Sequence, residues 1–200
     1  MQAKSKARHE RYLAVAMQLF AEHGFVGAST DEIVARAGGS KATLYSLFPT
    51  KESLVTGLMD QLAAAMNRST PEPALQSLPL REALTRIGLD ALRGVTSERA
   101  VTLLRLALGE YNRFPELSAT LWKHGPAITY ANFRAFLKLR QKRGELDVDD
   151  TQLAAEHFFG SIVGHLQWKV AMGICKPPTP AEQKRRVVAA VKTFLARYAV

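Results

Sequence analysis

The sequence predicts an all-α protein of about nine helices in two unequal groups. Apolar residues recur at helical spacing along most of its 200 residues, whereas the strict apolar–polar alternation of half-buried strands is almost absent. Ser or Thr followed three residues later by Glu, and glycines placed after apolar runs, mark helix starts and stops. Three prolines between residues 69 and 80 predict the boundary between the two groups.

Four helices are expected before this boundary. The first is predicted to end at Gly24, where glycine stops its apolar stripe. The stripe consists of Tyr12, Leu13, Ala16, Leu19 and Phe20. Ser29 and Glu32 have the spacing of a capping box and predict the start of a second short helix. The pair Gly38-Gly39 ends it.

The third helix is predicted at 41–48, with Ser40 as its cap. Thr50 caps the fourth, which is expected over 50–67. Residues 1–54 are therefore predicted to form a first domain, the fourth helix to connect, and residues 68–200 to form a second domain. Six further helices are expected at 80–93, 98–113, 115–123, 126–142, 151–173 and 180–198.

Composition narrows the class of protein. One cysteine excludes an internal disulfide. No apolar secretory segment follows the charged N-terminus, and the most apolar stretch, 157–175, is interrupted by polar residues. A soluble cytoplasmic protein without a membrane span is expected. The net charge of +9 favours a polyanionic partner. Most of that excess lies beyond residue 60, and the basic stretch from Lys4 to Arg11 fits either a DNA-gripping arm or a solvated tail.

The segment from Gly38 to Leu54 has the composition of a DNA-reading element. A glycine turn between two short helices is typical of a helix-turn-helix, whose second helix enters the major groove. Leu44 and Phe48 are expected to face the core, which leaves the polar side chains outside. Base contacts would select the sequence and phosphate contacts would position the protein. The candidate DNA-binding residues are Thr30, Ser40, Lys41, Ala42, Thr43, Tyr45, Ser46 and Lys51.

This part of the chain resembles the DNA-binding domain of TetR-family transcriptional regulators from Leu19 to Leu54. The positions that match the family pattern are Leu19, Phe20, Gly24, Phe25, Ile33, Ala37, Gly38, Ser40, Lys41, Thr43, Leu44, Tyr45, Phe48, Lys51, Glu52 and Leu54. The resemblance implies a homodimer whose two heads, one DNA turn apart, read a near-palindromic operator in double-stranded DNA.

Three positions depart from the family pattern. Gly39 replaces a Val-like residue and is expected to loosen the packing at the turn. Ala42 replaces a frequent glycine and adds a methyl group to the groove-facing surface. Leu47 replaces a frequent histidine and removes a phosphate donor. An operator sequence is therefore not transferable from relatives.

The C-terminal part resembles the AcrR/AefR-type regulatory domains of the same family. The resemblance implies a helical domain that binds a small-molecule effector and dimerises. Large side chains that fit either core or an apolar ligand pocket are Met66, Tyr111, Trp122, Tyr130, Phe133 and Trp168. Apolar residues of the last two helices that fit either core or a dimer interface are Phe158, Phe159, Ile162, Val163, Leu166, Val188, Val191, Phe194 and Leu195.

No pattern of catalytic residues or cofactor-binding loops is visible, so the protein is not expected to be an enzyme. The histidines lack metal-ligand spacing, and no metal or cofactor is expected. Cys175 has no resolving partner, so it fits an inert thiol better than a redox sensor. The most favoured function is a transcriptional repressor released from its operator by an apolar or amphipathic ligand. Two alternatives are a nonspecific architectural DNA-binding protein and a ligand-binding helical domain with a vestigial head.

Overall fold

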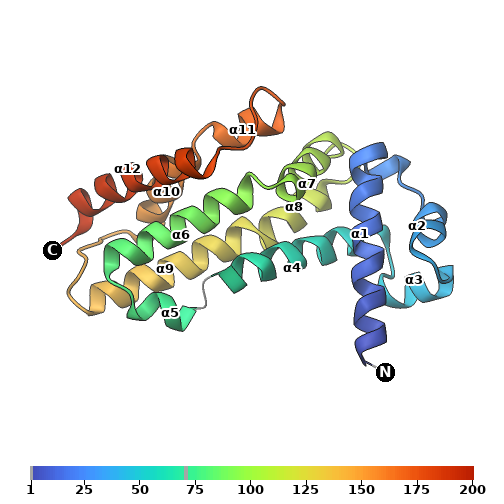
Figure 1. Ribbon diagram of the computed structural model, residues 1–200, viewed down its shortest axis with the longest axis horizontal. Coiled ribbons are helices and arrows are strands. Elements are labelled where there is room, and N and C mark those ends of the chain that lie inside the picture. Colours follow the sequence, from blue (N-terminus) through green and yellow to red (C-terminus); the bar gives the residue numbers. More distant parts are fainter. Residues whose placement is uncertain (1, 70–71) are drawn as a thin grey trace. The chain divides into compact units, whose positions relative to one another are not determined.

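A computed structural model describes the backbone of residues 2–69 and 72–200 and the side chains of residues 6–62 and 75–200. The predicted all-α fold is confirmed: the described residues form twelve helices and no β-strand (Figure 1). The chain divides into two compact units. Unit 1 comprises Met1–Gln61 and Thr102–His124, and unit 2 comprises Leu62–Val101 and Gly125–Val200. The helices are α1 Gln2–Gly27, α2 Thr30–Ala37, α3 Lys41–Leu47, α4 Lys51–Ser69, α5 Glu72–Ser77, α6 Leu80–Val95, α7 Glu98–Gly109, α8 Pro115–His124, α9 Pro126–Lys142, α10 Thr151–Val163, α11 Leu166–Ala171 and α12 Pro180–Tyr198.

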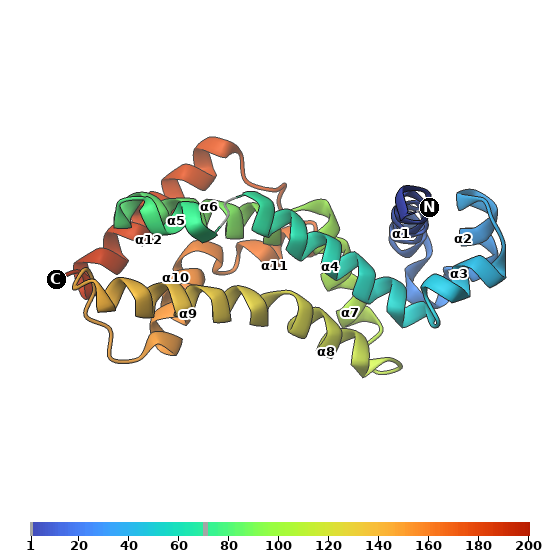
Figure 2. The ribbon, with the colours of Figure 1, turned by 90° about the horizontal axis from the view of Figure 1, so that it is seen from below.

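In unit 1, α2 and α3 lie beside α1 (Figure 2). Their shared core contains Leu13, Phe20, Ile33, Leu44 and Phe48, all buried. Within each helix the apolar residues repeat at helical spacing, which is why the three helices enclose one apolar core. The predicted inward direction of Leu44 and Phe48 is thereby confirmed.

The backbone of α1 is broken at Gly24 and then resumes as far as Gly27. Gly24 has φ 70° and ψ −178°, a conformation that glycine adopts without steric cost. Gly24 therefore interrupts the first helix instead of ending it as predicted. The interruption places Phe25 in the core, where its ring makes an edge contact with Phe114 at a centroid distance of 4.9 Å.

The predicted capping box at the start of α2 is only half formed. Ser29 accepts a hydrogen bond from the backbone N–H of Asp31 at 3.1 Å. The carboxylate of Glu32 instead binds Arg36 at 2.7 Å, one turn along the same helix. At α12 the Thr179–Glu182 pair does form the complete box. The difference follows from Arg36, which offers Glu32 a charged donor that outcompetes a backbone N–H.

The start of α4 is capped by a reciprocal pair. Ser53 N–H donates to the hydroxyl of Thr50 at 3.3 Å, and Thr50 N–H donates to the hydroxyl of Ser53 at 3.3 Å. One turn further, Gly57 lies against the side chains of Leu13 and Phe48, where an added Cβ would be 3.0 and 3.1 Å from their atoms. The glycine allows α4 to pack closely on α1 and on the end of α3.

Unit 2 has its own aromatic core. Phe133 of α9 stacks on Phe158 of α10 at 4.6 Å between centroids, and Phe194 of α12 makes an edge contact with Phe158 at 5.3 Å. Gly88 of α6 lets this core close, because a Cβ there would lie 2.8 Å from a methyl carbon of Val187. Helices α6, α9, α10 and α12 therefore pack around one apolar centre.

Two predicted elements of unit 2 differ in the structure. The long helix expected at 151–173 consists of α10 and α11, separated at Gly164, whose φ of 48° ends α10. The proline-rich boundary segment contains a short helix, α5. Proline is tolerated in the first turn of a helix because its missing N–H would be unpaired there, and Pro73 occupies that turn.

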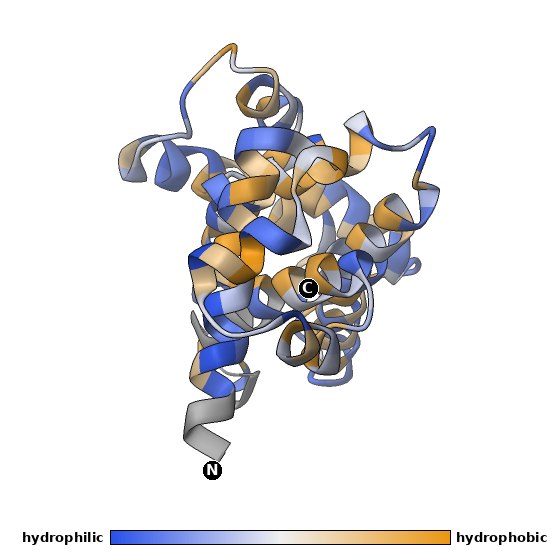
Figure 3. Cartoon of the chain, turned by 90° about the vertical axis from the view of Figure 1, so that its right-hand side faces the viewer, coloured by the Kyte–Doolittle hydropathy of each residue, from blue (hydrophilic) through white to orange (hydrophobic). Residues whose placement is uncertain are grey.

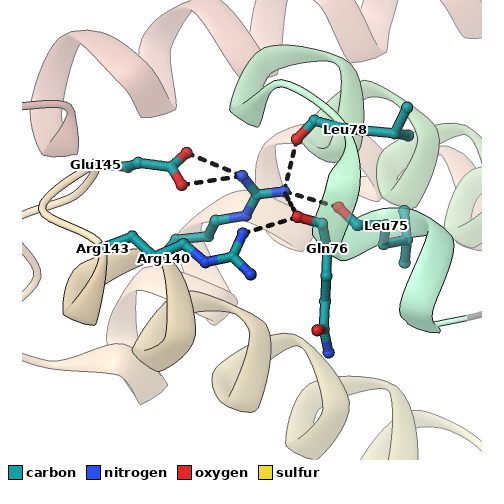
Figure 4. A network of polar contacts seen from close by, with 6 residues as sticks. All are labelled: Leu75, Gln76, Leu78, Arg140, Arg143 and Glu145. Atoms are coloured by element: carbon teal, nitrogen blue, oxygen red, sulfur yellow. Dashed lines mark hydrogen bonds and ion pairs between the residues drawn. The ribbon is translucent and has the colours of Figure 1, made fainter.

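A buried arginine connects α9 to α5 and to the turn after α9 (Figure 4). Arg140 is 2% exposed, and its guanidinium donates to both carboxylate oxygens of Glu145 at 3.1 and 2.9 Å. It also donates to the carbonyl oxygens of Leu75 at 2.7 Å and Leu78 at 2.8 Å. The planar guanidinium thus serves a carboxylate and the carbonyls at the end of a short helix simultaneously, which a lysine cannot do.

Hydrophilic and hydrophobic residues alternate along the helices (Figure 3). Among the described residues, no helix is both long and apolar enough to cross a membrane.

Candidate nucleic-acid interface

The helix α3 owes its start to Ser40. The Ser40 hydroxyl accepts a hydrogen bond from Thr43 N–H at 3.2 Å and lies 3.0 Å from the Thr43 hydroxyl. Such a cap satisfies one of the backbone donors that a helix leaves unpaired at its start. The helix ends at Leu47, and the N–H of the following residue, Phe48, donates to the carbonyl of Leu44. Both ends therefore follow from local sequence, as predicted.

One side of α3 faces outward. Leu44 is buried, while Ser40, Lys41, Ala42, Tyr45 and Ser46 are exposed and Thr43 is half-buried. The Tyr45 side chain remains 45% exposed although it is large and aromatic. An exposed face of small, hydroxyl-bearing and cationic side chains on a short helix is the arrangement expected of a major-groove reading surface.

Two contacts join this face to the beginning of α2. The ammonium of Lys41 lies 2.6 Å from a carboxylate oxygen of Asp31. The hydroxyls of Thr30 and Tyr45 lie 3.3 Å apart. The structure thus brings the predicted residues Thr30, Lys41 and Tyr45 together. Asp31, which is not one of the predicted DNA-binding residues, lies among them.

The glycine turn packs against α1. Gly39 has φ 112°, and a Cβ there would lie 2.5 Å from the hydroxyl oxygen of Tyr12. Tyr12 is completely buried, and its hydroxyl has no hydrogen-bond partner in the described part of the chain. The expectation that Gly39 loosens the turn is wrong, because the Tyr12 side chain occupies the space that a larger residue at position 39 would need.

Lys51, predicted to grip a phosphate, is held by the end of α1. Its ammonium donates to the carbonyl of Val26 at 3.2 Å and lies 4.8 Å from the centre of the Phe25 ring. Burial lowers the pKa of Lys51. An ammonium has three donors, so the Val26 contact leaves two, and the phosphate contact of Lys51 stays a prediction.

The six candidate ligand residues are distributed over both units. Tyr111 and Trp122 are exposed in unit 1, and Trp168 is exposed in unit 2. Tyr130 and Phe133 both contact the ring of Phe159, at 5.2 and 5.0 Å between centroids, and Phe133 belongs to the core of unit 2. Met66 lies outside the residues whose side chains the structure describes.

The nine candidate dimer residues are mostly core. Those buried within the single chain are Phe158, Phe159, Ile162, Leu166, Val191 and Phe194. Val163 and Leu195 are half-buried against the same core, and Val188 is exposed. In the single chain these six are core residues of unit 2, and their part in a dimer interface stays a prediction. Two of them, Phe158 and Phe194, also line an open groove between α10 and α12 with a volume of ≈ 520 Å³.

The groove is lined by aromatic side chains, those of Phe158, Phe194 and Tyr198, as well as by small and polar ones. Gly160 and Ser161 of α10 face it, as do Ala190, Thr193 and Arg197 of α12. Phe158 and Phe194 belong to the apolar stripes visible in the sequence, whereas the small and polar residues of the lining carry no such periodic signal. Within the described residues, no group of three or more His, Cys, Asp or Glu side chains is arranged to hold a metal ion.

Two family models match the chain. Residues 13–58 match the family described as bacterial regulatory proteins, tetR family, and residues 82–200 match the C-terminal domain of AefR-like transcriptional repressors. The first match includes the exposed face of α3 and its glycine turn. The second extends from α6 through α12.

Solved structures and relatives agree with these matches. A protein from Mesorhizobium loti assigned to the TetR-family transcriptional regulators is 25% identical, with a TM-score of 0.85 and 98% of each chain covered. The flavonoid-responsive regulator FrrA is 30% identical, with a TM-score of 0.79 and coverage of 97% of this chain and 98% of the other. The uncharacterised HTH-type transcriptional regulator Rv1556 of Mycobacterium tuberculosis is 31% identical over 143 residues, which are 70% of this chain and 65% of the relative.

Proposed function

Because the chain belongs to the TetR family of bacterial transcriptional regulators, we propose that it is a homodimeric repressor which a small ligand releases from DNA. The observation that carries this proposal is the exposed face of α3. Its polar side chains are held outward by the buried Leu44 and by the Ser40 cap. Neither constraint explains why the large Tyr45 side chain stays exposed beside a lysine and small hydroxyl-bearing residues, and DNA reading accounts for that arrangement.

DNA recognition is assigned to two kinds of residue. Lys41, Ala42, Tyr45 and Ser46 would face base edges or adjacent phosphates in the major groove. Thr30 and Lys51, at the starts of α2 and α4, would contact backbone phosphates. Two such heads in a dimer would read the two halves of a near-palindromic operator.

Selection from a pool of random duplexes tests this function. Wild-type protein is expected to enrich a palindromic site and to bind it at least a thousand-fold more tightly than random DNA at physiological salt. Enrichment of no sequence would instead favour the architectural alternative if duplexes of any sequence bind, or the vestigial-head alternative if none binds.

The Tyr45→Ala variant tests the reading face itself. It is expected to lose about 1–3 kcal/mol of operator binding while keeping its affinity for random DNA, because Tyr45 would contact base edges. Fluorescence anisotropy with the selected operator and a scrambled duplex measures both. The Lys51→Ala variant is the control: it should weaken both duplexes alike and lower the salt slope by about one. Equal losses on both duplexes for Tyr45→Ala would contradict base reading.

Dimerisation is assigned to the groove between α10 and α12. The groove is open, and Val188 of α12 is an exposed apolar residue on one of the two bordering helices. Packing the same two helices of a second copy against it would give a symmetric four-helix interface.

The effector is proposed to be an apolar or amphipathic molecule with aromatic character. FrrA, a relative of similar length and fold, is flavonoid-responsive by name, and unit 2 is rich in aromatic side chains that contact one another. The ligand must bind the DNA-incompetent form more tightly, and shifting a nearly fully bound population to a nearly free one requires about 5 kcal/mol of differential affinity.

Segment 102–124 could couple ligand binding in unit 2 to DNA binding by unit 1. It belongs to unit 1, where Phe114 contacts Phe25 and the carboxylate of Glu110 accepts from Val26 N–H at 3.4 Å. The same segment is covalently continuous with α9 in unit 2. Titration of the operator complex with a flavonoid such as quercetin tests the class: release with a saturable midpoint supports it, and an unchanged complex at saturating flavonoid contradicts it.

A further inference from the structure

Lys41 is the one charged residue of α3, and an acidic residue of α2 already holds its ammonium. The Lys41 Nζ–Asp31 Oδ1 distance is 2.6 Å, and the two side chains are 56% and 68% exposed. The pair therefore lies on the surface that the proposed function assigns to DNA. Because both side chains are exposed, the ion pair does not belong to a buried hydrogen-bond network.

Lys41 is protonated at neutral pH and can pair with Asp31. The hydrogen bond to Asp31 is the largest cause that raises the pKa of Lys41, and the attraction between the two charges adds to it. An ammonium with a raised pKa stays protonated below and well above neutrality. Lys41 therefore keeps its charge through the neutral range, and loss of its proton does not switch the contact with Asp31 there.

A DNA phosphate would compete with Asp31 for the same ammonium. On a random duplex, where binding is almost entirely electrostatic, a phosphate that approached Lys41 would also lie beside the Asp31 carboxylate, and repulsion between the two anions favours the contact only after the ammonium has left Asp31. In an operator complex the ammonium can keep Asp31 on one N–H and offer its two others to a base edge. Asp31 would therefore weaken binding to random DNA more than binding to the operator.

We propose that Asp31 is a specificity-determining residue, which restrains Lys41 and so suppresses nonspecific DNA binding. The proposal rests on the proposed function, because it requires that α3 reads an operator. Asp31 contacts no base in this assignment. It acts through the position and charge of Lys41, and its effect should disappear when Lys41 is absent.

The Asp31→Asn variant tests this role, since it keeps the shape of the side chain and removes its charge. Affinity for a random duplex is expected to rise about two- to five-fold, the range for releasing an exposed ion pair. The slope of log affinity against log salt should steepen by about one unit, which corresponds to one additional phosphate contact. Operator affinity should change less than two-fold, so discrimination between the two duplexes falls.

Three controls make the outcome decisive. Glu116→Gln removes the same charge from an exposed position on α8. It should not reproduce the effects of Asp31→Asn on the affinities for the random duplex and the operator. Asp31→Asn in a Lys41→Ala background should have no effect, whereas general repulsion between Asp31 and DNA would persist there. Asp31→Ser, which also lacks the charge and suits the start of a helix, replaces Asp31→Asn if thermal denaturation shows that the latter is unfolded.

The proposal is overturned by an unchanged affinity for random DNA, by an equal gain on both duplexes, or by a gain that survives in the Lys41→Ala background. A failure of the wild-type protein to select any operator would instead remove the proposed function on which the inference rests. The two failures are therefore distinguishable.

Discussion

At the scale of single residues, the turn of the DNA-reading motif depends on a pair far apart in the sequence. Gly39 provides a backbone conformation at φ 112°, and the Tyr12 hydroxyl fills the space beside it. A side chain at position 39 is therefore penalised twice, once by the backbone and once by Tyr12. Glycine at position 39 is therefore matched to the Tyr12 side chain that packs beside it.

A double-mutant cycle at these two positions separates the penalties. Gly39→Ala is expected to destabilise the protein by about 2–3 kcal/mol, from backbone strain and overlap with the Tyr12 hydroxyl together. Tyr12→Phe alone should change stability by less than about 1 kcal/mol, because its hydroxyl has no partner among the described residues. The double variant is expected to be about 1 kcal/mol more stable than Gly39→Ala alone. Without the hydroxyl, the atom nearest to the alanine Cβ would be Cζ of residue 12, at 3.6 Å.

Urea denaturation at fixed protein concentration measures all four proteins of this cycle. Strictly additive changes in the free energy of unfolding would show that a side chain at position 39 does not clash with the Tyr12 hydroxyl. Operator affinity of the double variant gives a second reading, because a displaced turn would move α3 without unfolding the head.

At the scale of elements, α5 depends on one buried arginine of α9. Arg140 supplies donors to the carbonyls of Leu75 and Leu78 and pairs with Glu145 (Figure 4). A helix end leaves its last carbonyls without intrahelical partners. A six-residue helix is too short to be stable alone, so these contacts and the packing of Leu75 and Leu78 hold it in place.

Replacing Arg140 with methionine is expected to cost about 3–5 kcal/mol, because it leaves the carboxylate and two carbonyls without their donor. Arg143→Ala is the matched control. Arg143 is exposed and makes one such bond, to the carbonyl of Gln76 at 2.7 Å, and its loss should cost less than about 1 kcal/mol. The free energies of unfolding from urea titrations decide the matter, and equal costs would contradict the central role given to Arg140.

At the scale of the whole molecule, the assembly of two chains is testable through one glycine. Gly160 lines the groove between α10 and α12, and no atom lies within 4 Å of the position its Cβ would take. Gly160→Arg should therefore leave the single chain folded while placing a bulky charge where the partner would pack. We expect the molar mass in solution to halve, as sedimentation equilibrium would show.

Gly109→Arg is the matched control, because its Cβ would also meet no atom within 4 Å and it lies at the end of α7. It should remain dimeric. Gly160→Arg should also bind the operator more weakly, since two unlinked heads lose the advantage of a high effective concentration. If the Gly160→Arg protein remains dimeric, the proposal that this groove is the dimer interface is contradicted.

Local signals in the sequence were sufficient for most elements of the fold. The caps Ser40, Thr50 and Thr179 occupy the predicted helix starts, because capping joins residues three positions apart. The inward direction of Leu44 follows equally from helical periodicity. Predictions failed where a second local feature intervened: Gly164 divides the helix expected at 151–173, and Arg36 draws Glu32 away from its capping position.

The sequence by itself determined the all-α class, the family and the residues that face outward on the reading helix. These depend on spacings of three to four residues, which the chain expresses directly. Tertiary structure alone decided that Lys41 is held by Asp31, that Tyr12 fills the space beside Gly39, and that Phe158 is core. Each of these depends on which helix packs against which, and in what register. Contacts between residues distant in sequence are selected by the packing of whole helices, so the residues involved carry no local signal of their partners.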